Sequence, residues 1–387
     1  MSPQQPGRIL LTGARAPVAL DLARQFAAAG WQVHTADSQP AHATAASRAV
    51  HAHHRLPPPR QQAQAFAREL GALCRRQAID LVLPTCEEVF YLAHGREQLP
   101  AHTRLVCMDL PLLRRLHSKW AFIALARQAG LRVPDSQQVH QLEQARQWAA
   151  GRPLVLKPEF SRFGVEVRLY RDGLPAAAPP LDGRPWVAQQ LLPGQEICSY
   201  GVAHQGRLLA HAAYRPGWRM ARSASYYFDA VDNPDILAQT TALVAALGYS
   251  GQIAFDWIVD EHGRATVIEC NPRSTSAVHL FAGSDALVQA VTGNAGDCRQ
   301  PAPGSAAMLA PMMWLHAAPL SLLRGQWAAW RDDYRRASDV LARPGDARPR
   351  GQVLRDLLHY ARASRHHRGN LRAASTVDIE WDGQPLP

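Results

Sequence analysis

Apolar residues along the first 110 positions fall into two kinds of run: short continuous runs typical of buried strands, and longer runs with helical spacing. Gly13 and Gly30 stand where a strand and a helix are expected to end. The pattern predicts strands over 8–13, 31–37, 79–85 and 104–109, and helices over 16–30 and 57–76. Because strands and helices alternate, residues 1–112 are expected to form a Rossmann-like α/β domain with a parallel, doubly wound sheet.

The pattern changes beyond residue 112, where strands become frequent and are punctuated by Gly, Pro and polar turns. Helical stretches are predicted over 114–130, 142–150 and 234–247, and strands over 153–158, 165–170, 185–192, 196–204, 207–215, 251–259 and 265–271. This mixture predicts an α+β domain over residues 113–298. Residues 299–387 are rich in arginine and are expected to form a mostly helical C-terminal extension.

The formal net charge of +10 raises nucleic-acid binding as an alternative function. The cations are spread along the chain without a basic run longer than a pair, so we expect no nucleic-acid partner. The six cysteines form no CxxC pair, which argues against a zinc site and favours a reducing, cytoplasmic compartment. The first residues lack the apolar core of a signal peptide, and prolines interrupt the longest apolar stretch, 306–323, so no membrane span is expected.

Lysine is almost absent from this chain. Of 42 basic side chains only Lys119 and Lys157 are lysines, and the other forty are arginines. An ammonium is a compact charge on a thin stem that fits between phosphate oxygens, whereas a guanidinium is a wide planar fork. The two lysines therefore indicate two places where a compact cation is needed.

Acidic side chains stand inside an apolar hairpin predicted over 251–271. Side chains alternate along a strand, so Glu269 and Asn271 emerge on the same face, and Asp256 lies in an apolar run on the partner strand. Two carboxylates and an amide oxygen form a ligand set that suits Mg²⁺, with Mn²⁺ as a substitute. The alternative is a surface hairpin whose acids face solvent.

These residues occur in an order that resembles the ATP-grasp superfamily, and the resemblance covers about residues 1–290. The order is Lys119, then Lys157 within LVLKP, then VAQQLLPGQE, then Asp256 within FDW, and then ECNPR over 269–273. The resemblance implies that residues 113–298 form an ATP-grasp domain of two α+β subdomains, preceded by the α/β domain. It also implies a carboxylate–amine ligase that uses ATP and forms ADP.

The resemblance assigns a role to each motif residue. Lys119 and Lys157 would contact the α and β phosphates, and the segment from Ser161 to Gly164 would cover the phosphates through its backbone N–H groups. It has one glycine where many members of the superfamily have several.

The adenine and ribose contacts that the resemblance implies lie over residues 189–196. Gln189 would meet the adenine amino group, and the backbone of Gln190 and Leu192 would complete the contact with the base. Glu196 would hold the ribose hydroxyls. Many members have Glu at the position of Gln189, and Gln still offers an acceptor oxygen there.

Arg273 is the expected catalytic residue, because in the superfamily a cation here stabilises the phosphoryl group during transfer. The alternative is a structural ion pair with Glu269. Weaker substrate candidates are Glu87 and Glu88, which follow a predicted strand at its carboxyl end, and Arg219. A structural acid at a helix N-terminus is the alternative for the two glutamates. The histidine-rich segments 51–55 and 365–368 are interpreted as exposed segments.

The function expected is thus ADP-forming condensation of a carboxylate with an amine, with small-molecule substrates, ATP and Mg²⁺. If the chain forms an assembly, we expect a homodimer. The rival enzyme is an NAD(P)-dependent oxidoreductase built on the N-terminal domain, but only Gly13 precedes its first helix, where GxGxxG would be needed. A basic nucleic-acid-binding protein is the other alternative.

Overall fold

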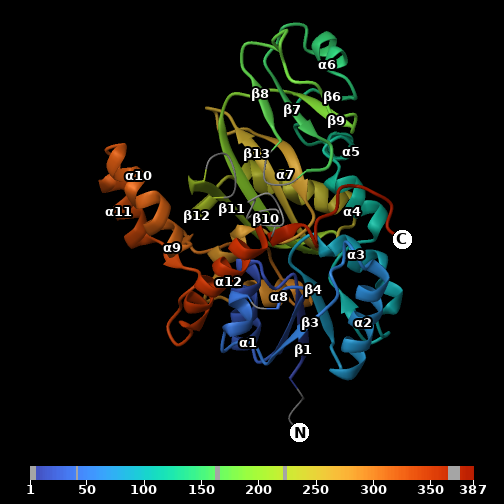
Figure 1. Cartoon of the computed structure of the whole chain (residues 1–387), viewed down its shortest axis with the longest axis vertical. Helices are drawn as coiled ribbons and strands as arrows, with labels where there is room; N and C mark the ends of the chain where they lie inside the picture. Colours follow the sequence, from blue (N-terminus) through green and yellow to red (C-terminus); the bar gives the residue numbers. More distant parts are fainter. Residues whose placement is uncertain (1–5, 41, 162–165, 221–224, 365–374) are drawn as a thin grey trace.

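The structure is a computed structural model that describes residues 6–40, 42–161, 166–220, 225–364 and 375–387. Three sheets follow one another in space, with the N-terminal sheet at the bottom of Figure 1, a large sheet in the middle and a small sheet at the top. A pair of helices projects sideways from the large sheet. No helix in the described ranges is long and apolar enough to cross a membrane.

The N-terminal sheet is parallel, with the strand order β3-β2-β1-β4-β5. Ile9 and Leu11 point into a core shared with helix α1, whereas Leu10 points into a second core on the opposite face, shared with helix α2. Both faces are therefore covered, and the predicted doubly wound sheet is confirmed. Its elements are β1 (Arg8–Thr12), α1 (Pro17–Ala28), β2 (Gln32–Asp37), β3 (Ala52–Arg55), α2 (Ala63–Arg76), β4 (Leu81–Pro84), α3 (Glu88–His94) and β5 (Arg104–Leu105).

Strand β3 corrects the interpretation of residues 51–55 as an exposed segment. His54 and His53 are half-buried in this strand and lie beside β2, where His34 is 1 % exposed. The rings of His34 and His54 stack at 5.3 Å between centroids, and their nitrogens lie 3.0 Å apart. A histidine pair can thus form part of a sheet edge when each ring covers the other. The second histidine-rich segment, 365–368, lies outside the described residues.

The predicted helix over 114–130 is broken into α4 (Leu110–His117) and α5 (Ala121–Gln128). At the break, the N–H of Lys119 donates to the carbonyl of Glu159 at 3.1 Å, so it makes no helical hydrogen bond. The hydroxyl of Ser118 accepts from the N–H of Ala121 at 2.9 Å and caps the second helix. The break places Lys119 at a junction between the N-terminal domain and the small sheet.

The small sheet has the order β6-β9-β7-β8 and is antiparallel, with α6 packed against it (Figure 1). Its core contains Trp186, Leu154 and Leu156. The elements are β6 (Ser136–Val139), α6 (Leu142–Ala149), β7 (Leu154–Pro158), β8 (Arg168–Tyr170) and β9 (Trp186–Gln190). This sheet and the large sheet are joined through the segment 191–194, which connects β9 to β10.

The large sheet has the order β14-β13-β10-β11-β12-β15-β16. Tyr200 and Trp257, both fully buried, point into cores on its two faces. Strands β10 to β14 are antiparallel to their neighbours, and helix α7 packs on one face. The elements are β10 (Gln195–His204), β11 (Arg207–Arg219), β12 (Ser225–Val231), α7 (Pro234–Ala246), β13 (Gly251–Val259) and β14 (Ala265–Asn271).

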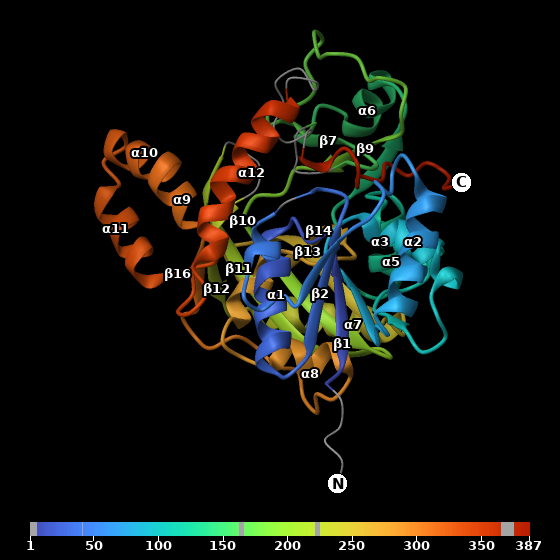
Figure 2. The same cartoon turned by 60° about the horizontal axis from the view of Figure 1, so that its bottom comes forward.

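The last part of the chain extends the large sheet and covers part of the N-terminal domain. Strands β15 and β16 extend the large sheet, α9 to α11 form the projecting arm, and α12 lies against the N-terminal domain (Figure 2). Residues 375–387 then pass over the N-terminal sheet (Figure 1). The elements are a 3-10 helix (Ser276–Phe281), α8 (Ala286–Thr292), β15 (Ala306–Met308), α9 (Ala310–Met312), a π-helical turn (Met313–Ala317), α10 (Ala318–Leu323), α11 (Trp327–Arg336), β16 (Ser338–Asp339) and α12 (Arg348–Ser364).

Because His34 and His42 are buried, we expect the fold to be less stable in acid. Burial lowers the pKa of His34 and of His42 to about 4, so the folded state resists protons that an unfolded histidine accepts below about 6.5. The free energy of unfolding should therefore fall as pH drops from about 6.5 towards 4. Urea unfolding at a series of pH values measures this slope. His34→Gln should flatten it, and an unchanged slope in a folded variant would contradict the assignment.

Candidate active site

The two lysines of the chain converge on strand β14 although they come from different parts of the fold. Lys119, at the break between α4 and α5, is 2 % exposed, and its Nζ lies 3.4 Å from Glu269 Oε1. It also donates to the carbonyl of Ser161 at 2.9 Å. Lys157, near the end of β7, is 3 % exposed and donates to the carbonyl of Ile268 at 3.0 Å. Two ammonium groups are thus buried beside one strand.

A β-bulge makes this arrangement feasible. Asp256 of β13 pairs with Glu269 of β14, and the next residue, Trp257, pairs with Val267. Ile268 therefore has no pairing partner on β13. The extra residue locally disrupts the ladder of hydrogen bonds. Lys157 uses the carbonyl of this extra residue as its hydrogen-bond acceptor. The bulge also brings Ile268 and Glu269 to the same level of partial exposure despite their being adjacent in a strand.

Asp256 and Glu269 are directly opposed carboxylates. Burial, followed by the negative charges of Glu269 and Glu196, raises the pKa of Asp256 to about 7. Burial also lowers the pKa of Lys157 to about 8. A divalent cation between the two carboxylates would remove their repulsion, and the amide oxygen of Asn271 projects from the same strand, so these residues fit a hard cation such as Mg²⁺. Within the described ranges, no group of three or more His, Cys, Asp or Glu side chains is placed to hold a metal ion.

Arg273 lies beyond the end of β14 and turns back towards Asn271. Its Nη2 donates to Asn271 Oδ1 at 3.1 Å, and its backbone N–H donates to the carbonyl of Asn271 at 2.8 Å. The carboxylate nearest to the guanidinium is that of Glu87, with 3.8 Å between Nη2 and Oε1. The structure therefore pairs Arg273 with Glu87, whereas the alternative drawn from the sequence was an ion pair with Glu269. The catalytic role of Arg273 stays a prediction.

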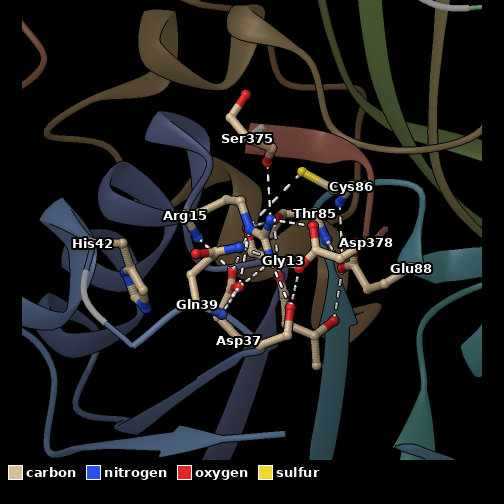
Figure 3. Close-up of polar contacts among 12 residues, drawn as sticks. Gly13, Arg15, Asp37, Gln39, His42, Thr85, Cys86, Glu88, Ser375 and Asp378 are labelled. Carbon is tan, nitrogen blue, oxygen red and sulfur yellow. Dashed lines mark hydrogen bonds and ion pairs between the residues drawn. The ribbon is translucent and has the colours of Figure 1, made fainter. Parts of the chain in front are cut away.

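Glu87 and Glu88 are adjacent but face different parts of the molecule. Glu88 Oε1 accepts hydrogen bonds from the Thr12 hydroxyl at 2.8 Å and from the N–H of Thr85 at 2.9 Å, within the N-terminal domain (Figure 3). A Cβ on Gly13 would lie 2.6 Å from the same carboxyl group, which explains the glycine. Burial raises the pKa of Glu88. Glu88 thus ties β1 to β4, and Glu87 is the member of the pair that reaches Arg273.

The residues expected to contact adenine and ribose lie along the chain segment that leads from β9 of the small sheet to β10 of the large sheet. Gln189 is 2 % exposed in β9, and its Nε2 donates to the Ser136 hydroxyl at 3.2 Å. Gln190 closes β9, and Leu192 lies in the connecting segment. Glu196, on β10, pairs with Arg219 at 2.8 Å. The weak substrate candidate Arg219 and the expected ribose ligand therefore contact each other.

The connecting segment has a backbone that only glycine tolerates. Gly194 has φ +139°, and a Cβ there would lie 2.4 Å from the carbonyl oxygen of Val259. The segment is therefore held close against β13. Of the expected phosphate-covering segment, Ser161 is described and contacts Lys119 through its carbonyl, whereas Gly164 lies outside the described residues.

Sequence reasoning missed several residues of this site. Glu159 accepts hydrogen bonds from the Ser118 hydroxyl and from Gln138 Nε2, the latter at 2.7 Å, and so joins the helix break to the small sheet. Trp381, near the end of the chain, donates its backbone N–H to Glu87 Oε2 at 3.2 Å. The SK pair at the helix start could have suggested a cap at Ser118. No signal in the sequence connects Trp381 with Glu87, 294 positions away.

The arrangement of the three sheets is that of the ATP-grasp fold. No protein-family model and no curated protein matches the sequence. Solved structures do match the fold. N5-carboxyaminoimidazole synthetase from Staphylococcus aureus is similar with a TM-score of 0.62 at 14 % identity, over 84 % of this chain and 86 % of that one.

Two other similar structures come from different enzymes. L-amino acid ligase from Bacillus licheniformis has a TM-score of 0.56 at 17 % identity, over 75 % of this chain and 76 % of that one. The biotin carboxylase domain of 2-oxoglutarate carboxylase from Hydrogenobacter thermophilus, solved with MgADP, ADP and bicarbonate, has a TM-score of 0.58 at 14 % identity, over 75 % of this chain and 70 % of that one. At these identities the likeness establishes the shared fold.

Proposed function

We propose that this chain is an ATP-dependent ligase that activates a substrate carboxylate as an acyl phosphate and condenses it with an amine, releasing ADP and phosphate. The observation that carries the proposal is the burial of both lysines of the chain beside the opposed carboxylates Asp256 and Glu269. Enzymes that share the fold include a synthetase and an amino acid ligase, which supports ligation as the reaction class.

The cations of the site are suited to a nucleoside triphosphate. Lys119 and Lys157 would contact its α and β phosphates, because compact ammonium groups fit between phosphate oxygens. Gln189, Gln190 and Leu192 would contact adenine along the connecting segment, with Glu196 at the ribose. Asp256, Glu269 and Asn271 would hold Mg²⁺, or Mn²⁺, which would neutralise phosphate charge.

In the first step, an oxygen of the substrate carboxylate attacks the γ-phosphorus of ATP. The bond from this phosphorus to the β–γ bridging oxygen breaks, and ADP leaves with the electron pair. Arg273 lies at the end of the carboxylate-bearing strand, where its guanidinium can stabilise the charge on the transferring phosphoryl group. In the second step, the amine attacks the acyl carbon, phosphate leaves, and the amine nitrogen loses a proton. Activation thus divides a difficult condensation into two easier steps.

Glu87 is suited to the amine substrate because its buried carboxylate lies 3.8 Å from Arg273 and would attract an ammonium group. Glu88, which is occupied within the N-terminal domain, is not part of this proposal. The oxidoreductase alternative is disfavoured, since the carboxyl ends of β1 and β2, where a dinucleotide would lie, are covered by residues 375–378.

The reaction class is tested by measuring nucleotide products across pairs of carboxylates and amines, with amino acids as the first set. We expect ADP and phosphate to form in equal amounts with at least one pair, and to depend on Mg²⁺. The double variant Lys119→Met, Lys157→Met is the control for contaminating ATPases. AMP and pyrophosphate as products, or ADP formation retained by the control, would contradict the proposal.

Lys157→Arg should weaken ATP binding although it keeps the charge, because a guanidinium is too wide for a position that is 3 % exposed and shaped around an ammonium. We expect the dissociation constant of MgATP, measured by calorimetry, to rise on the order of tenfold. Arg264→Lys, in the exposed turn between β13 and β14, is the matched control and should bind MgATP normally. Normal binding by Lys157→Arg would remove the argument from the rarity of lysine.

Arg273→Ala should lower kcat about a hundredfold, the cost of losing one electrostatic contact with the transition state, while MgATP affinity changes little. Because the substitution also removes the guanidinium beside Glu87, Arg273→Lys serves as a second variant that keeps a positive charge there. Single-turnover ADP formation and equilibrium MgATP binding separate the two effects. If rate, affinity and melting temperature fell together in both variants, Arg273 would be a structural residue.

A further inference from the structure

The C-terminal segment 375–387 is fastened to the N-terminal domain at Arg15. This side chain is 5 % exposed and lies between two carboxylates (Figure 3). Asp37 holds one side, with 2.9 Å between Arg15 Nε and Asp37 Oδ1, and Asp378 holds the other, with 2.6 Å between Arg15 Nη1 and Asp378 Oδ1. Nη1 also donates to the carbonyl of Ser375 at 2.9 Å. Asp37 thus orients a guanidinium whose outer edge binds the end of the chain.

The fastening lies where open α/β sheets bind their ligands. Arg15 follows β1, Asp37 ends β2, and the hydroxyl of Ser38, also beyond β2, donates to Asp378. Ligands of such sheets bind outside the carboxyl ends of the strands. Here the carboxylate of Asp378 occupies that position, so the chain fills the crevice of its own N-terminal domain.

Three residues after Asp378, Trp381 contacts two sides of the proposed active site. Its ring stacks on Phe90 of α3, with 4.6 Å between the ring centroids. It also makes a T-shaped contact with the ring of Phe160, with 5.4 Å between the centroids. Its backbone N–H donates to Glu87 Oε2 at 3.2 Å. The side chain is 5 % exposed. One residue of the C-terminal segment therefore touches α3 and the end of β7 together.

The residues that Trp381 contacts are next to those that carry the proposed chemistry. Glu87 is the carboxylate beside Arg273. Phe160 stands between Glu159, which fixes the backbone of Lys119, and Ser161, which accepts a hydrogen bond from the Lys119 ammonium group. Gly383 is held so close that a Cβ there would lie 2.5 Å from the Phe160 ring. The segment thus packs tightly against the support of Lys119.

We propose that residues 375–387 form a strap that positions the active site, with Asp378 as its fastening and Trp381 as its positioning residue. The strap holds Glu87 towards Arg273 and supports Phe160 beside Lys119, and it closes the crevice at Arg15 to substrates. The amine and the carboxylate would then meet beside the pair formed by Glu87 and Arg273. This inference rests on the proposed function for its kinetic consequences, but its structural part stands without it.

The structural part is tested by measuring amide hydrogen exchange on the full chain. The unsubstituted protein is compared with the variants Asp378→Asn, Trp381→Ala and Trp381→Phe. Asp382→Asn is the matched control, because Asp382 lies in the same segment and pairs with Arg60 at the surface. We expect exchange to rise in residues 83–94 and 154–161 for Asp378→Asn and Trp381→Ala, but not for the control. Trp381→Phe, which keeps an aromatic ring and the backbone donor, should restore most of the protection.

The kinetic part uses the carboxylate and amine pair that gives ADP. Trp381→Ala should raise KM for the amine on the order of tenfold and lower kcat, while the MgATP dissociation constant rises by a smaller factor, because Lys119 is only one of the proposed ATP contacts. A purely structural residue would instead lower the melting temperature and leave the kinetics of the folded fraction unchanged. Unchanged exchange at 83–94 and 154–161 in folded Asp378→Asn and Trp381→Ala would overturn the strap. If no pair gave ADP while exchange rose as expected, the proposed function would fail and the strap would stand.

Discussion

The burial of two ammonium groups beside β14 is the constraint on which much of the surrounding structure depends. An unpaired charge taken out of water costs several kcal/mol, so each lysine needs acceptors placed within reach. Lys119 pairs with Glu269 and donates to the carbonyl of Ser161, and Lys157 donates to the carbonyl of Ile268. Two irregularities accompany these contacts. The helix break at residues 118–120 brings in Lys119, and the bulge at Ile268 releases a carbonyl for Lys157.

The same constraint explains why three separate parts of the chain meet here. Lys119 comes from the break between α4 and α5, Lys157 from the small sheet, and Glu269 from the large sheet. The carboxylate beside Lys119 is that of Glu269, and the negative charges near Lys157 are those of Glu269 and Asp256, so both lysines depend on the large sheet for their counter-charges. Electrostatic pairing across the sheets therefore favours the assembled arrangement, and loss of one partner would leave a buried charge uncompensated.

Much of the fold could be predicted from apolar periodicity, because strands such as β1 and β4 consist mainly of continuous apolar runs. Strand β3 was not predicted because its half-buried side chains include His53 and His54, which carry no apolar signal, although His54 stacks on His34. The helix break was not predicted because residues 114–130 keep helical spacing, and the competing hydrogen bond to Glu159 comes from 40 positions away. The order of motifs predicted which residues would form the site, and their roles stay predictions, but only the folded chain shows that Arg273 faces Glu87 and that Trp381 contacts both Phe90 and Phe160.

Charge balance limits what this site can accept. The cations Lys119, Lys157 and Arg273 are matched by the carboxylates of Glu269, Asp256 and Glu87 in their surroundings. A site that is already close to neutral gains little from a bare triphosphate, whose several negative charges would meet Asp256 and Glu269 as well as the lysines. A triphosphate that carries a divalent cation would change this balance, because the cation would offset phosphate charge and could bind the same two carboxylates. Under the proposed function, the opposed acids would therefore favour the metal-bound form of the nucleotide over the bare triphosphate, a preference that the lysines alone would not supply.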